Sequence, residues 1–141
     1  TRAPGTDVKQ RCIGNLIAEL SPSAYAEMQT MYPIARDLPR TLVGFENHSG
    51  QTFLGDRVEP LAKTITGFGN NASAEYEGAR YKNVFGSYMH GSLLPKNPHF
   101  ADYLIWLALC QRYPEAPLTL PALADAEELA AHNYVVQRYG T

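Results

Sequence analysis

The order of its segments constrains the fold of this chain most, because the β-type runs all lie within the first ninety residues and two helices follow them. Cys12 to Leu20 has the apolar content of a strand or a short mixed segment. Further β-type runs are expected at 41–45, 51–54 and 63–67, with two short strands between 77 and 88. This order predicts a mixed α/β domain with an incomplete sheet, since a complete α/β domain alternates strands and helices throughout.

The clearest single element is a helix that starts after residue 97. Asn97 is a favourable N-cap, Pro98 suits the first helical position, and Phe100, Leu104 and Leu107 fall on one stripe.

Two further segments are less regular. A final, alanine-rich helix is expected at about 122–138, where Gly140 would end it. Residues 21–40 contain three prolines and predict an irregular insertion with a helical turn near 24–28.

Composition excludes several classes of protein. The 141 residues are enough for one domain, and 45% hydrophobic with 18% charged residues is typical of a globular chain. A formal net charge of -2 gives no electrostatic footprint for nucleic acid, and no apolar run is long enough to span a membrane. Cys12 and Cys110 form neither a disulfide framework nor a metal-type spacing. We therefore expect a cytoplasmic protein without a metal or cofactor.

Two polar clusters, 44–52 and 86–94, contain residues that could carry chemistry. His90 follows a β-type run, and strand ends are where open α/β sheets place catalytic groups. A neutral imidazole there could take a proton from a thiol. His90 could also be a partly buried histidine that bonds to the backbone.

His48 and Glu46 lie two residues apart, so in a strand they would share a face. They could form a carboxylate–histidine pair, supply two metal ligands, or stabilise a turn. No third ligand follows at a recognisable spacing, which argues against a metal. Neither Ser49 nor Ser92 lies in a Gly-x-Ser-x-Gly elbow, and Cys12 lacks the sharp turn of a reactive thiol.

Four ordered motifs resemble one known family. They are Gly-Phe-Glu-Asn-His-Ser-Gly-Gln-Thr at 44–52, Gly-Phe-Gly-Asn-Asn at 67–71, Glu-Gly at 77–78 and Gly-Ser-Tyr-Met-His-Gly-Ser-Leu-Leu-Pro-Lys-Asn-Pro at 86–98. Together they resemble the glutaminase subunits of lipid II isoglutaminyl synthase, which belong with the cobyric acid synthase-type glutamine amidotransferases. The resemblance covers about residues 11–112 and is interrupted by 21–40.

The resemblance implies a fold and a division of the chain. Residues 1–113 would form the C-terminal half of a class I glutamine amidotransferase-like, flavodoxin-like three-layer domain, and 114–141 a C-terminal helical extension. The sheet of such a domain is parallel and buried on both faces. We therefore expect an exposed apolar face where the N-terminal half belongs, unless 122–138 folds back over it.

The resemblance also implies an activity. In the family, a cysteine in a Gly-x-Cys-Gly-Gly elbow attacks the side-chain amide of glutamine, a histidine activates it, and backbone N–H groups hold the oxyanion. The ammonia passes to a Mur-ligase-like partner subunit, with which the glutaminase forms a heterodimer and which uses ATP to amidate the D-glutamate of lipid II.

Site residues follow from the same motifs. His90 matches the catalytic histidine and Arg11 an arginine that lines the active site, while Glu46, Asn47 and His48 are further candidates for substrate binding or active-site lining. No Gly-x-Cys-Gly-Gly occurs in this chain, and in the family it lies upstream of these motifs. The chain alone is therefore expected to be inactive.

One position departs from conventional class I enzymes, which carry an acid two residues after the histidine. Ser92 stands there, so another group must orient His90, and Glu46 is the candidate. Two alternatives remain open. One is a binding domain that kept the scaffold without the chemistry, and the other is the amidotransferase domain of a cobyric acid synthase-type enzyme with a corrinoid acceptor.

Overall fold

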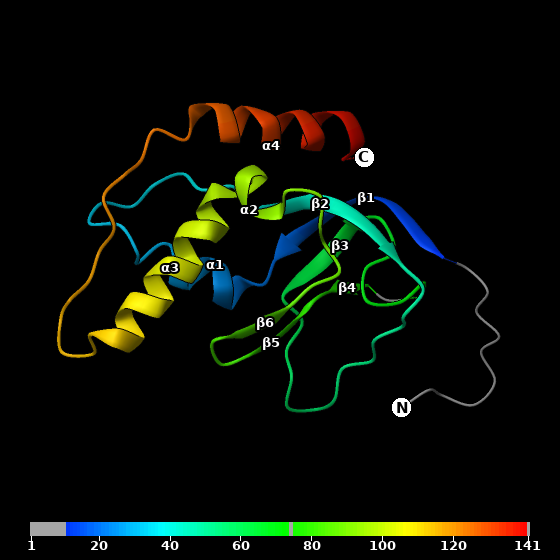
Figure 1. Ribbon diagram of the computed structural model, residues 1–141, viewed down its shortest axis with the longest axis horizontal. Coiled ribbons are helices and arrows are strands. Elements are labelled where there is room, and N and C mark those ends of the chain that lie inside the picture. Colours follow the sequence, from blue (N-terminus) through cyan, green and yellow to red (C-terminus); the bar gives the residue numbers. More distant parts are fainter. Residues whose placement is uncertain (1–10, 74, 141) are drawn as a thin grey trace.

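The computed structural model describes residues 11–73 and 75–140, which form a curled sheet with helices on both sides (Figure 1). The strands are β1 (Cys12–Leu20), β2 (Thr41–His48), β3 (Ala62–Thr66), β4 (Tyr76–Glu77), β5 (Ala79–Tyr81) and β6 (Val84–Gly86). The helices are α1 (Pro22–Met28), α2 (Leu93–Lys96), α3 (Pro98–Arg112) and α4 (Ala126–Tyr139). None of the helices in these residues is long and apolar enough to cross a membrane.

The main sheet has the order β2-β1-β3-β4, and β5 and β6 form a separate hairpin. All of these pairings are antiparallel. The mixed α/β class predicted from the sequence is confirmed. The expectation of a parallel sheet, on which the expected exposed face was based, is wrong for the described residues, because neighbouring strands here run in opposite directions.

Two expected strands differ from those in the structure. β2 continues through His48, so Glu46 and His48 belong to a strand and not to a turn. Residues 51–54 form a loop instead of a strand. Their polar groups bond to the turn at 70–72, since Gln51 Oε1 accepts from the Ala72 N–H at 2.9 Å and the Thr52 N–H donates to the Asn70 carbonyl at 2.7 Å.

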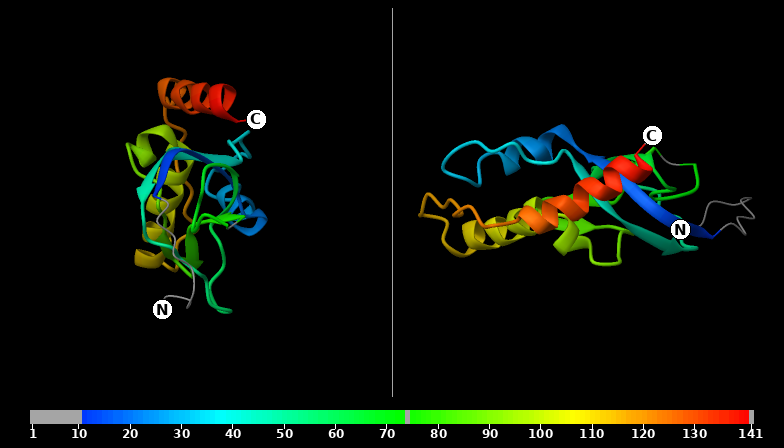
Figure 2. Two further views of the ribbon diagram at one scale, coloured as in Figure 1. Left: turned by 90° about the vertical axis from the view of Figure 1, so that its right-hand side faces the viewer. Right: turned by 90° about the horizontal axis from the view of Figure 1, so that it is seen from above.

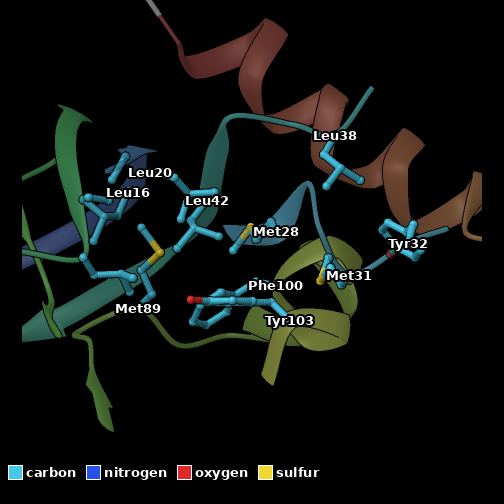
Figure 3. Close-up of a cluster of buried hydrophobic side chains, with 13 residues drawn as sticks. Leu16, Leu20, Met28, Met31, Tyr32, Leu38, Leu42, Met89, Phe100 and Tyr103 are labelled. Atoms are coloured by element: carbon cyan, nitrogen blue, oxygen red, sulfur yellow. The ribbon is translucent and has the colours of Figure 1, made fainter. Parts of the chain in front are cut away.

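The main core lies on one face of β1 and β2, which we call the inner face, and packs against α1 and α3 (Figure 3). β1 contributes Leu16, Ala18 and Leu20 to it, at alternate positions. Its buried members are Leu16, Ala18, Leu20, Met28, Met31, Tyr32, Leu38, Leu42, Leu61, Ala62, Met89, Phe100 and Tyr103. All three methionines of the chain are among them, and their flexible side chains suit the irregular space beneath a curled sheet.

The opposite, outer face of β1 and β2 is covered at one end by α4. Ile17 and Val43 are paired across the two strands and fully buried there. α4 crosses β1 in the view from above (Figure 2), and the Thr66 hydroxyl donates to the Tyr139 carbonyl at 2.9 Å. The C-terminal helix therefore folds back over part of the sheet, although it begins four residues later than expected.

Asn97 ties α3 to the sheet by an unexpected use of its side chain. It precedes the helix as predicted but makes no side-chain capping bond. Its amide instead accepts from the Val43 N–H and donates to the Val43 carbonyl, both at 2.8 Å, so it bonds the edge of β2 as a neighbouring strand would. This fully buried amide fixes the start of α3 beside the strand that carries the polar cluster.

We expect Asn97→Ala to lower the free energy of unfolding by about 2–4 kcal/mol, because it leaves a buried N–H and a buried carbonyl of Val43 without partners. Urea denaturation measures this. Asn133→Ala on the exposed side of α4 is the matched control and should cost less than about 0.5 kcal/mol. A loss below about 1 kcal/mol for Asn97→Ala would contradict the bonding described.

Two buried histidines join α3 and α4 to the same end of β2. His132 contacts the Thr41 hydroxyl at 2.9 Å, His99 contacts the Thr41 carbonyl at 3.0 Å, and their ring centroids lie 5.4 Å apart. Burial lowers the pKa of His99 to about 4, and burial also lowers the pKa of His132. Both rings are therefore neutral in the folded protein near neutral pH.

This pair predicts a loss of stability in mild acid. The folded pKa of His99 lies below its ordinary value of 6.5, so the unfolded chain binds the proton first as the pH falls. The stability that the neutral His99 contributes is fully present above pH 6.5 and is lost towards pH 4. The resulting decrease in unfolding free energy is roughly 2 kcal/mol between pH 7 and pH 5. His99→Gln keeps a donor for Thr41 without a titrating group. The difference in unfolding free energy between the two pH values should shrink by that amount in the variant, and an unchanged difference would contradict the assignment.

Candidate active site

The open end of the outer face gathers residues from three segments. Ile13 pairs with Asn47 and Asn15 with Phe45 across β1 and β2, and Phe45 forms an isolated antiparallel bridge with His90. Directly paired residues of antiparallel strands point to the same face. His90 therefore lies on the outer face beside Phe45, beyond the part that α4 covers.

His90 is held by its backbone and leaves its ring accessible. Its N–H donates to the Phe45 carbonyl at 2.8 Å, and its carbonyl accepts from the Phe45 N–H at 3.0 Å. The imidazole meets the Phe45 ring in a T-shaped contact at 5.7 Å and forms no hydrogen bond with any residue in 11–73 or 75–140. The interpretation of His90 as a partly buried histidine whose ring bonds to the backbone is wrong, because the residue is exposed and its ring bonds to none of the described residues.

Arg11 and Asn47 form a polar pair on the same face. The Arg11 Nε–H donates to Asn47 Oδ1 at 2.7 Å. Ile13 is 50% exposed and Phe45 36% exposed, so apolar surface surrounds these polar groups. The structure thus brings three residues singled out from the sequence, His90, Arg11 and Asn47, to one open face.

Glu46 lies on the inner face and is fully buried. Its carboxylate accepts from the N–H groups of Phe68 and Gly69, at 2.6 and 3.2 Å. Alternate residues of a strand point to opposite faces, so Glu46 is separated from Phe45 and His90 by the sheet itself. The expectation that Glu46 orients His90 is wrong, and the carboxylate instead fixes the turn that follows β3.

His48 shares the inner face with Glu46, and the two form the carboxylate–histidine pair that their spacing predicts. His48 Nε2 lies 3.1 Å from Glu46 Oε2, and Nδ1 lies 2.9 Å from the Gly50 carbonyl. Both ring nitrogens therefore face oxygen atoms, which fixes the orientation of the ring. The ring also stacks on Tyr88, with centroids 3.7 Å apart. Within the described residues no group of three His, Cys, Asp or Glu could hold a metal ion.

The motifs from which the resemblance was drawn are joined by hydrogen bonds. Glu46 of the first motif bonds to Phe68 and Gly69 of the second. The Asn70 side chain accepts from the Gly78 N–H at 2.7 Å and donates to the Gly78 carbonyl at 2.8 Å. Gly78 adopts a φ of 71°, and a Cβ there would lie 2.7 Å from the Gly86 carbonyl oxygen. These contacts connect the first three motifs, and the close approach of Gly78 to Gly86 joins them to the segment that leads to His90.

Cys12 belongs to the inner face and has none of the features of a nucleophile. It pairs with His48 across β1 and β2, so the sheet separates it from His90. Burial raises the pKa of its thiol, which keeps it protonated and unreactive. Among the described residues, only a weak contact from the Gln51 amide, at 3.8 Å, reaches its sulfur.

Glu77 is the site residue to which sequence reasoning gave no role. It is fully buried and accepts hydrogen bonds from Ser87 and Tyr88, three and two residues before His90. Its place in the Glu-Gly motif at 77–78 was the available signal.

Comparison with known proteins shows that the site residues lie within a segment that matches a known domain family. The family model for the CobB/CobQ-like glutamine amidotransferase domain matches residues 6–98. The chain is 45% identical over 96 residues to the glutamine-hydrolyzing lipid II isoglutaminyl synthase subunit GatD of Streptococcus pneumoniae, covering 67% of this chain and 36% of that protein. It is 37% identical over 105 residues to the subunit of the same name from Staphylococcus aureus, covering 74% of this chain and 42% of the relative.

A shorter match concerns a different type of synthase. The chain is 49% identical over 51 residues to a probable cobyric acid synthase of Methanothermobacter thermautotrophicus, covering 36% of this chain and 10% of that protein. The chain spans about two fifths of the length of the two lipid II isoglutaminyl synthase subunits that it matches.

Proposed function

Because this chain belongs to the CobB/CobQ-like glutamine amidotransferase domain family, we propose that it carries the histidine-bearing part of a glutaminase active site. One observation carries the proposal. His90 presents an unbonded imidazole on an open face, beside a polar pair of Arg11 and Asn47 and a rim of apolar surface. A general base needs such access to its reactant.

In the proposed reaction, a cysteine from another part of the complete domain attacks the side-chain amide carbon of glutamine. His90 accepts the thiol proton and passes it to the departing ammonia. Water then attacks the thioester with His90 as the base again, and glutamate is released. Arg11, oriented by Asn47, donates to the α-carboxylate of the bound glutamine.

The nucleophile lies outside this chain in this account. Cys12 is buried on the inner face with a raised pKa, and Gly-x-Cys-Gly-Gly does not occur in the sequence. We propose that the N-terminal part of the domain contacts the open outer face, where Ile13 and Phe45 expose apolar surface next to His90. This contact would bring the cysteine to the imidazole.

The acceptor of the ammonia is proposed from the relatives. Two of them are glutamine-hydrolyzing subunits of lipid II isoglutaminyl synthase, and the longer matches are to these. We therefore propose a heterodimer with a Mur-ligase-like synthetase subunit that amidates the D-glutamate of lipid II. The short match to a cobyric acid synthase supports a second candidate, in which the acceptor is a corrinoid.

Rescue by free ammonium separates these possibilities. The complete domain is combined with its synthetase, lipid II and ATP, and amidation is measured with glutamine or with ammonium chloride. Wild type should use both nitrogen sources, whereas His90→Ala should use ammonium and lose at least ~10²-fold with glutamine. Amidation of a corrinoid but not of lipid II would favour the second candidate. Absence of glutamine hydrolysis by the wild-type complete domain would instead favour a binding domain without chemistry.

A further inference from the structure

The three residues that precede His90, namely 87–89, are hydrogen-bonded to one carboxylate oxygen of Glu77, either directly or through the Ser87 hydroxyl. Glu77 Oε1 accepts from the Ser87 hydroxyl at 2.6 Å and from the Tyr88 N–H at 2.9 Å. The Ser87 oxygen in turn accepts from the Met89 N–H at 2.9 Å. The next residue along is His90, whose backbone bonds to Phe45.

Glu77 itself is rigidly placed. It belongs to β4, where its backbone pairs with Ala62 of β3, and its side chain is fully buried. The neighbouring Gly78 is bonded through both its N–H and its carbonyl to Asn70. A buried carboxyl group is costly unless hydrogen bonds satisfy it. Here those bonds lead to the His90 segment.

We propose that Glu77 is a positioning residue for His90, and the inference rests on the glutaminase function proposed above. By accepting hydrogen bonds from Ser87 and Tyr88, Glu77 fixes the position and direction of the segment that leads to the backbone bridge between His90 and Phe45. His90 then projects from the outer face at one defined place, within reach of a thiol on the facing part of the domain. In conventional class I enzymes an acid two residues after the histidine would orient the imidazole. In this proposal Glu77 positions His90 instead, and it does so through the backbone of the preceding segment.

The role depends on hydrogen-bond acceptance at Oε1 and not on charge. Oε2 is buried without a hydrogen-bond partner among the described residues, and no ion pair formed there includes Glu77. Glu77→Gln retains a carbonyl oxygen for Ser87 and Tyr88, and Glu77→Ala removes it. A displacement of about 1 Å at a catalytic group costs on the order of 10²-fold in rate. We therefore expect the two variants to behave differently.

In the complete domain, Glu77→Ala should lower kcat for glutamine hydrolysis by about 10- to 100-fold, with KM changed less than about threefold. Glu77→Gln should keep kcat within about threefold of wild type. Asp102→Ala is the matched control, because Asp102 is another buried carboxylate. It lies on α3 and accepts from the Tyr32 hydroxyl, away from the His90 segment. It should lower stability and leave kcat within about twofold.

A second readout needs no enzymatic activity. Amide hydrogen exchange at Tyr88, relative to Leu16 in β1, should accelerate at least about tenfold in Glu77→Ala of this chain and stay unchanged in Glu77→Gln and Asp102→Ala. If Glu77→Ala does not fold, Ser87→Ala replaces it and should accelerate exchange at Met89, whose N–H loses its acceptor.

The two readouts separate failure of this inference from failure of the proposed function. Unchanged kcat and unchanged Tyr88 exchange in Glu77→Ala would overturn the positioning role, and so would an equal loss in Glu77→Gln. A different outcome is accelerated Tyr88 exchange in Glu77→Ala together with a wild-type complete domain that does not hydrolyse glutamine. This would overturn the glutaminase proposal, but it would still show that Glu77 holds the segment before His90 in place.

Discussion

Replacing His90 with alanine in the complete domain should lower kcat for glutamine hydrolysis by at least ~10²–10⁴-fold, because it removes the proposed acceptor of the thiol proton. The residue is exposed and its ring bonds to no described residue, so the fold should barely change. Steady-state glutamate release gives the kinetic loss. Urea denaturation should show a change in unfolding free energy below about 0.5 kcal/mol.

His48 is the matched comparison, since it is the other histidine of the polar clusters and lies on the opposite face of β2. His48→Ala breaks the contacts with Glu46 and Tyr88 and should act mainly on stability. Near-normal turnover in His90→Ala together with abolished turnover in His48→Ala would show that the catalytic histidine was assigned wrongly.

This chain alone should release no glutamate from glutamine. Removal of the nucleophile from a catalytic set costs several orders of magnitude in rate, and the buried thiol of Cys12 faces away from His90. A coupled assay for glutamate, with the purified chain at high concentration, measures this. Cys12→Ser is the control. Turnover that disappears in Cys12→Ser would contradict the account, because Cys12 would then be the nucleophile.

Much of the fold follows from local signals. The apolar run from Cys12 to Leu20 becomes the central strand, and the Asn97-Pro98 pair opens a helix as predicted. Local signals failed at 51–54, where β-type residues form a loop. Their backbone bonds go to a turn about twenty residues later, and a pattern within one segment contains no information about such a partner.

The site was predictable in its residues but not in its arrangement. Alternation along a strand separates Glu46 from Asn47 by face once β2 extends that far. Which of the two faces receives His90 depends on the bridge with Phe45, a contact between residues 45 positions apart. The role of Glu77 depends in the same way on tertiary contacts with Ser87 and Tyr88.

The central claim is that His90 of this chain serves a nucleophile held by another part of the domain, and fragment complementation tests it most directly. The proposed N-terminal part, which is expected to hold a Gly-x-Cys-Gly-Gly elbow, is produced separately, and glutamate release is measured for each part and for their mixture. We expect turnover only in the mixture, and its loss when this chain carries His90→Ala. Equal turnover by mixtures with wild-type and His90→Ala chains would contradict the claim.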